Sequence, residues 1–127
     1  MFVYANFAIG EEIGCRDLVI APELVARWRE LFPEDRTGDV MPAGMVAIVT
    51  SRAYASILMP RPPGNVHGAQ RFELFRLPRI GERVTTALSC AHKEMKGERR
   101  WVRFATATAD ADGNLCFRGE QTVLWAA

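Results

Sequence analysis

A mainly apolar stretch from Ala43 to Met59 limits the possible folds of this chain more than any other feature. Pro42 precedes it, and proline suits a helix start because the first turn does not need the missing N–H group; Pro60 ends it. Such a helix is apolar around most of its circumference, so other elements must cover it on several sides. Its middle is too polar, and it is too short, to cross a membrane. A curved β-sheet would cover it well.

The rest of the sequence supplies strands for such a sheet. Before the helix, hydrophobic spacing predicts strands at residues 2–9 and 12–20 and a short helix at 21–32, which Pro33 ends. After it, strands are predicted at residues 66–77, 83–95, 99–109 and 115–125. The 127 residues contain no internal repeat or linker and suffice for one core. We therefore predict a single α+β domain over residues 1–127.

Two X-Gly dipeptides predict how the last three strands pair. Lys96-Gly97 and Asp112-Gly113 favour two-residue hairpin turns between antiparallel strands. Because the turn fixes the register, these turns predict three opposed pairs: His92 with Trp101, Phe104 with Gln121, and Val102 with Val123.

Charge and cysteine usage exclude several classes of partner. A net charge of +1 at pH 7 gives no reason to expect nucleic acid or an anionic membrane surface. The N-terminal residues lack the basic region and cleavage site of a signal peptide, which favours a cytoplasmic location. Cys15, Cys90 and Cys116 are far apart in the sequence, so reduced thiols are expected rather than disulfides or a metal site.

One long apolar helix followed by antiparallel strands is the order of elements in the hot-dog fold, where a curved antiparallel sheet wraps around one long central helix. The segments Gly44-Met45, 66–78 and 80–84 resemble the MaoC-like hydratase/dehydratase family, and the resemblance covers about residues 22–125. It implies a substrate that is an acyl thioester of coenzyme A or acyl carrier protein, with no further cofactor and no metal. It also implies a homodimer or heterodimer of hot-dog subunits joined side by side.

The catalytic signature of that family, Asp-x-Asn-Pro-x-His, is incomplete in this chain. When the signature is aligned with residues 38–44, Asp39 and Pro42 match it, but Met41 replaces the asparagine and Gly44 replaces the histidine. A second alignment begins the helix at Met41 and shortens the histidine-bearing loop away; it is preferred because the apolar run starts there. Both alignments lack the histidine, the most suitable acid–base group at neutral pH.

His67 is the candidate replacement, because it begins a strand that we expect to pack near the helix N-terminus, close to Asp39. As alternatives, His67 is a surface or hydrogen-bonded structural residue, and the Asp39 carboxylate satisfies free N–H groups at the helix start. Arg71 is expected to share a strand face with His67 and to contact substrate or pair with Glu73. The resulting prediction has Asp39 and His67 as catalytic residues and four substrate-binding residues: Gly38, Gly44, Met45 and Arg71.

Three functions follow from the resemblance. The favoured one is an acyl-thioester binding protein of the enoyl hydratase/dehydratase type with a degenerate catalytic pair. The first alternative is a catalytically silent subunit that binds the acyl chain or completes a dimer with an active hot-dog partner. The second is a hot-dog thioesterase, although those enzymes commonly carry Glu or Asp on the central helix and residues 43–59 contain neither.

Overall fold

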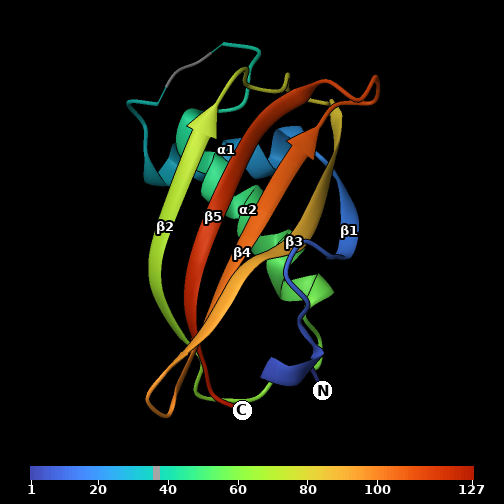
Figure 1. Cartoon of the computed structure of the whole chain (residues 1–127). Coiled ribbons are helices and arrows are strands. Elements are labelled where there is room, and N and C mark those ends of the chain that lie inside the picture. The colour runs from blue at the N-terminus through green and yellow to red at the C-terminus, as the bar shows by residue number, and fades with distance from the viewer. Residues whose placement is uncertain (36–37) are drawn as a thin grey trace.

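A computed structural model describes residues 1–35 and 38–127 of the chain. Its five antiparallel strands form one curved sheet in the order β1-β3-β4-β5-β2, with the helices on one face (Figure 1). The strands are β1 (Glu12–Val19), β2 (Val66–Leu74), β3 (Arg83–Lys96), β4 (Arg99–Ala109) and β5 (Leu115–Trp125). The helices are α1 (Pro22–Leu31) and α2 (Val46–Ile57), with 3-10 turns at Tyr4–Asn6 and Ala43–Met45. The predicted antiparallel sheet around one long helix is confirmed.

The central helix α2 is covered on one side only. The buried side, which faces the sheet, carries Val46, Val49, Thr50, Ala53 and Ile57. Ala47, Ser51 and Arg52 on the opposite side are exposed, so this chain does not supply the cover on several sides that the apolar sequence predicted. Within the sheet, α2 packs chiefly against β1 and β3. The inner face of β5 and β2 therefore lies beyond the part of the sheet that α2 contacts most.

The strand predicted at residues 2–9 is wrong, because Tyr4–Asn6 forms a 3-10 turn. This segment crosses the end of the sheet: the Trp125 Nε1–H donates to the Phe2 carbonyl at 2.9 Å, and the Tyr4 N–H donates to the Ala127 carbonyl at 2.8 Å. Phe7 inserts its ring edge-on between Phe104 and Trp125. The alternating apolar residues thus fill the open end of the core instead of adding a strand.

One predicted hairpin register is right and one is wrong. Phe104 lies opposite Gln121 as predicted, although the connecting loop is longer than two residues, since the Asp110 N–H donates to the Asn114 carbonyl. In the first hairpin, His92 lies opposite Arg103 rather than Trp101. The turn there is centred on Gly97-Glu98, so Gly97 takes the first central position with φ +63°, as in a type II′ turn.

Candidate functional site

The loop before α2 holds Gly38 and Asp39 by their backbones. The Asp39 carbonyl accepts a hydrogen bond from the Ile80 N–H at 2.8 Å, and the Gly38 carbonyl accepts one from Arg29 Nη2 at 3.0 Å. The Asp39 side chain is exposed, and the first helical turn begins after Pro42 without a side-chain cap. The interpretation of Asp39 as the helix cap is therefore wrong.

The other two residues predicted near the helix start take part in packing. A Cβ atom on Gly44 would lie 2.5 Å from Cζ2 of Trp28, so only glycine lets the indole ring lie against this turn. The Trp28 Nε1–H donates to the Asp35 carboxylate at 2.8 Å, which fixes the ring in place. Met45 is fully buried in the core beneath. Trp28 thus packs against the turn that contains two of the predicted substrate-binding residues, Gly44 and Met45.

The predicted shared face of His67 and Arg71 is also wrong, because the register shifts between His67 and Ala69. His67 lies opposite Val123, a core residue, whereas Arg71 lies opposite Glu120 on the outer face. His67 is exposed, with Nε2 3.0 Å from the Ala69 carbonyl oxygen, while Arg71 lies on the other side of the sheet. The bulge therefore separates the two side chains.

Asp39 and His67 lie at opposite ends of β2 and form no pair. Asp39 is bound to Ile80, which follows the end of β2, whereas His67 is near the start of that strand. The seven steps from His67 to Leu74 span roughly 23 Å at about 3.3 Å per residue. A short loop joins the C-terminal end of α2 to the start of β2, so His67 lies near the end of the helix rather than its beginning (Figure 1). The predicted catalytic pair is not assembled within one chain.

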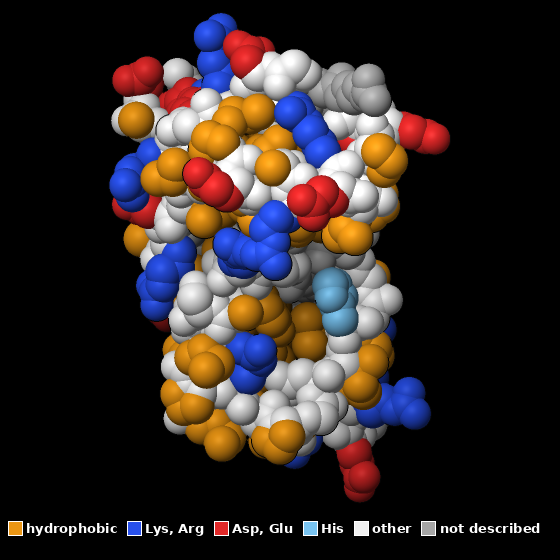
Figure 2. Space-filling model, turned by 180° about the vertical axis from the view of Figure 1, so that it is seen from behind, with side chains coloured by type: hydrophobic (Ala, Val, Ile, Leu, Met, Phe, Trp, Pro, Cys, Tyr) orange, Lys and Arg blue, Asp and Glu red, His pale blue; other side chains and the backbone are white. Residues whose placement is uncertain are grey.

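A different set of polar side chains lies on α2 and on the inner face of β2 and β5. Thr50 and Tyr54 lie one turn apart on α2, and the Tyr54 ring packs edge-on against Phe104 with ring centres 5.6 Å apart. Across the strands, Phe104 lies opposite Gln121 and Gln121 lies opposite Gln70. We call this set the inner-edge cluster: Thr50, Tyr54, His67, Gln70 and Gln121. On this helix side of the molecule, Figure 2 shows a hollow with hydrophobic side chains inside it and Lys or Arg side chains beside it.

Several buried polar atoms in this region have no hydrogen-bond partner within the described residues. Thr50 Oγ1 and Gln70 Nε2 belong to the inner-edge cluster, and Thr106 Oγ1 on β4 is next to them in the sheet. Leaving such a group unsatisfied costs about 1–3 kcal/mol, so each needs an explanation. Gly119 lets the Thr106 hydroxyl and the Phe72 ring pack close to its backbone, because a Cβ there would lie 3.0 Å from that oxygen and 3.1 Å from the ring. The region therefore presents hydrogen-bonding atoms beside apolar rings.

Tyr54 adds a further hydrogen-bond donor. Burial raises the pKa of Tyr54, and the Arg61 guanidinium, 5.9 Å from the ring centre, opposes this rise. The phenol stays protonated at neutral pH and is able to donate. Its place on α2, one turn after Thr50, aims both hydroxyl groups along the same side of the helix.

Comparison with known proteins decides the fold. No protein-family model and no curated protein matches the sequence. A MaoC-like dehydratase from Rhodospirillum rubrum has a similar structure, with a TM-score of 0.80 at 13% identity over 97% of this chain and 96% of that one. The chain adopts the hot-dog fold.

Two further proteins of similar structure have a named activity or a bound ligand. The HadBC (3R-hydroxyacyl-ACP dehydratase) complex from Mycobacterium tuberculosis matches with a TM-score of 0.70 at 15% identity, over 86% of this chain and 90% of that one. The protein SAV2348 from Staphylococcus aureus, solved in complex with CoA, matches with a TM-score of 0.68 at 10% identity, over 91% of this chain and 77% of that one. At these identities the likeness establishes the fold alone.

The described part of this hot-dog domain offers no metal centre, since no three His, Cys, Asp or Glu side chains gather there. No helix in residues 1–35 and 38–127 is long and apolar enough to span a membrane.

Sequence reasoning singled out only His67 of the inner-edge cluster, although signals for the other members were present. Thr50 interrupts an apolar helix, and Gly119 interrupts a long strand, where glycine often marks close approach of another group. The predicted pairing of Phe104 with Gln121 already placed an amide side chain on the face that carries the core. Only the fold shows that these positions meet beside α2.

Proposed function

We propose that this hot-dog chain binds an acyl thioester of coenzyme A or acyl carrier protein in the hollow between α2 and β2. The observation that carries the proposal is the set of unpartnered polar atoms, Thr50 Oγ1 and Gln70 Nε2, beside apolar rings. A thioester carbonyl oxygen accepts hydrogen bonds from such donors, and the acyl chain lies against the apolar side chains. The CoA complex of the Staphylococcus aureus neighbour supports the choice of ligand.

The proposal includes a second hot-dog subunit, identical or different, paired along β2. This strand is at the edge of the sheet, and Val66 and Leu74 at its two ends are 55% and 44% exposed. Unpaired edges associate readily, and a partner there would also approach the bare side of α2. The two-subunit dehydratase complex among the structural neighbours supports this arrangement. Sedimentation that finds only monomer at micromolar concentration would contradict it.

We propose further that the isolated chain hydrates enoyl thioesters very slowly. The reaction needs a base for water and an acid for the α-carbon, each contributing roughly 10²–10⁴-fold, and Asp39 and His67 are too far apart to share this work. Activity would appear with a partner that carries the full family signature. Loss of enoyl absorbance is followed with crotonyl-CoA for the wild type, Asp39→Asn and His67→Ala. Rapid turnover that both substitutions abolish would overturn this part.

Ligand binding is tested by calorimetric titration with medium-chain acyl-CoA. Thr50→Val removes one donor at nearly constant volume and should weaken binding about tenfold, the equivalent of one hydrogen bond. The matched control is Thr122→Val, because Thr122 lies opposite Arg103 and Ala69, away from the inner-edge cluster. Absence of heat with the wild type, alone and with any co-purified subunit, would refute thioester binding.

A further inference from the structure

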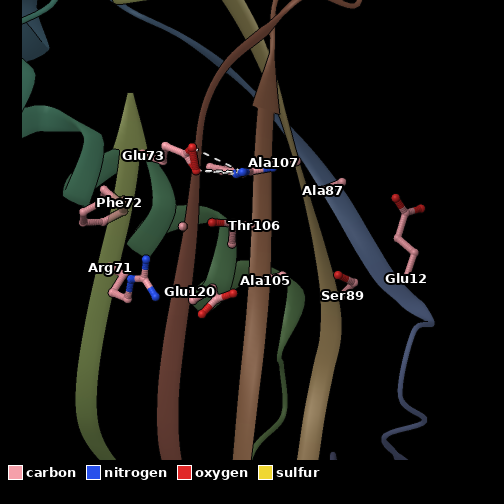
Figure 3. Close-up of a pocket in the computed structure, with 12 residues that line it drawn as sticks. Glu12, Arg71, Phe72, Glu73, Ala87, Ser89, Ala105, Thr106, Ala107 and Glu120 are labelled. Atoms are coloured by element: carbon pink, nitrogen blue, oxygen red, sulfur yellow. Dashed lines mark hydrogen bonds and ion pairs between the residues drawn. The ribbon is translucent and has the colours of Figure 1, made fainter. Parts of the chain in front are cut away.

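The outer face of the sheet, opposite α2, carries two straight rows of side chains. A shallow cavity of about 510 Å³ lies over them (Figure 3). Strand register defines the first row, which we call the glutamate row: Glu12, Ser89, Ala105, Glu120 and Arg71. It also defines the second, which we call the cysteine row: Cys15, Ala87, Ala107, Arg118 and Glu73. Each row runs across all five strands in the order β1-β3-β4-β5-β2.

In both rows, small side chains on β3 and β4 lie beside long side chains on β5. On β3 and β4 the rows carry only alanine and serine, so the middle of this face is low. On β5 they carry Arg118 and Glu120, which form a ridge beside the low strip. The surface is therefore a trough over β3 and β4 next to a ridge on β5.

The charges along the rows are partly paired. Arg118 donates two hydrogen bonds to Oε1 of Glu73, from Nη2 at 2.7 Å and from Nε at 2.9 Å. Arg103 Nε lies 4.0 Å from Oε2 of Glu120. Glu12 and Arg71, at opposite ends of the glutamate row, have no hydrogen-bond or ion-pair partner among the residues that the structure describes. Four strand spacings separate them, roughly 19 Å, so they cannot pair with each other in one chain.

We infer that this face stacks on the same face of a second copy, about a two-fold axis that runs along β4. This symmetry places the β5 ridge of each copy over the β3 trough of the other. It reverses the order of the glutamate row, so that Glu12 of each copy meets Arg71 of the other. Ala105 and Ala107 then meet their own counterparts at the axis, where small side chains allow close approach.

Shape selects this axis over the other two-fold arrangement. An axis across the strands would place each β5 on the other β5, so that ridge would meet ridge and the troughs would stay empty. It would also place Glu12 over Cys15, where its charge finds no partner, and Arg71 over Glu73, whose carboxylate Arg118 already occupies. The axis along β4 satisfies the two charges and fills the trough, and face-to-face sheets commonly pack with their strands within about 30°.

The stacking does not depend on the proposed thioester binding or on pairing along β2. It uses the face opposite α2, and Glu12 is on β1 at the edge of the sheet remote from β2. If both contacts form, the assembly is a tetramer; if only stacking forms, it is a dimer. A variant that disrupts stacking therefore halves the mass in either case.

The test is sedimentation velocity between about 10 and 300 µM protein, the range in which small interfaces associate. Glu12→Arg and Arg71→Glu should each raise the dissociation constant at least about tenfold through like-charge contact, and the double variant should restore it. Glu98→Arg on the hairpin tip changes the net charge by the same amount and sign as Glu12→Arg and is the control for that variant. Equal association of wild type and both single variants, or a double variant that stays dissociated, would overturn the proposal.

Cross-linking provides a second test that charge effects do not influence. In a Cys15→Ser background, Ala107→Cys places a thiol beside its own counterpart at the axis, so mild oxidation should give a covalent dimer. Thr85→Cys, on β3 and off the axis, should not cross-link. A cross-link in the control alone, or in neither variant, would contradict the axis along β4.

Discussion

Four buried threonines, one on α2 and three on the inner face of the sheet, differ in whether their hydroxyl groups are hydrogen-bonded. On the side toward β1, Thr86 Oγ1 and Thr108 Oγ1 lie 2.7 Å apart and satisfy each other. Thr50 Oγ1 on α2 and Thr106 Oγ1 on β4 are similarly buried, yet neither has a partner within the described chain. The first two hydroxyl groups satisfy each other within the single chain, whereas the second two are buried without a partner among the described residues. The unpartnered hydroxyl groups lie in the region where we propose that the ligand binds.

The largest expected effect tests the cover on α2. Val49→Asp places an unpaired charge on the side packed against the sheet, where Val49 is 1% exposed, and should cost about 4–5 kcal/mol or prevent folding. Ala47→Asp adds the same charge to the exposed side and should leave the melting temperature nearly unchanged. Thermal melts of both variants check this. Similar melting of the two variants would show that α2 is not covered on one side as described.

Replacing one threonine of each kind tests whether its hydroxyl group is hydrogen-bonded in the free protein. Thr86→Val leaves the Thr108 hydroxyl buried without its partner and should lower the free energy of unfolding by about 1–3 kcal/mol. Thr106→Val removes a hydroxyl that already lacks a partner, so it should be neutral or stabilising. Urea denaturation measures both values. An equal loss in the two variants would mean that Thr106 is satisfied in the free protein.

A pH titration tests the ion pairs that Arg76 forms just after the end of β2. Arg76, just after β2, pairs with Glu82 and with Asp110 beyond β4, and these hydrogen bonds lower the pKa of both carboxyl groups. A carboxyl whose folded pKa is depressed adds stability above its unfolded pKa, near 4, and loses it as the pH falls toward the folded pKa. The melting temperature should therefore fall on acidification below about pH 5. Asp110→Asn should flatten that fall, and an unchanged slope would contradict the assignment.

The smallest effect concerns the bulge in β2. Gly68 lies under Trp101, and a Cβ there would be 3.3 Å from the ring and 3.4 Å from the Thr122 carbonyl oxygen. Gly68→Ala should cost roughly 1 kcal/mol, because the indole must shift slightly. Ala69→Gly, which adds no contact, is the comparison variant. A stabilised Gly68→Ala protein in urea denaturation would show that the ring yields without cost.

Sequence periodicity was enough to predict most elements of this fold, except at residues 2–9. The apolar run at 43–59, the long alternating strands and the Asp112-Gly113 joint led to the central helix, the meander and the correct pairing of Phe104 with Gln121. These features depend on local patterns and on which side of a strand is apolar. The N-terminal alternation misled because a short apolar segment can fill a core as easily as form a strand.

The site was less accessible to sequence reasoning. Whether His67 meets Asp39 depends on the direction of β2 relative to α2, which neither residue encodes. The shift of register after His67 then moved Arg71 to the other face, and only Gly68 hinted at it. Thr50 and Gln70 stand out only because their buried polar atoms have no hydrogen-bond partner among the described residues. A sequence pattern does not show this.

The contact between the two ends of the chain has a consequence for the order of folding. Phe7 packs against Trp125, and Tyr4 is hydrogen-bonded to Ala127, so these N-terminal apolar residues are synthesised well before β5, the strand that buries them. Contacts so distant in sequence slow folding and leave hydrophobic surface exposed during synthesis. A chain shortened by its last strand would keep most of its helices and strands in sequence, yet it would present Phe2 and Phe7 to chaperones instead of to its own core.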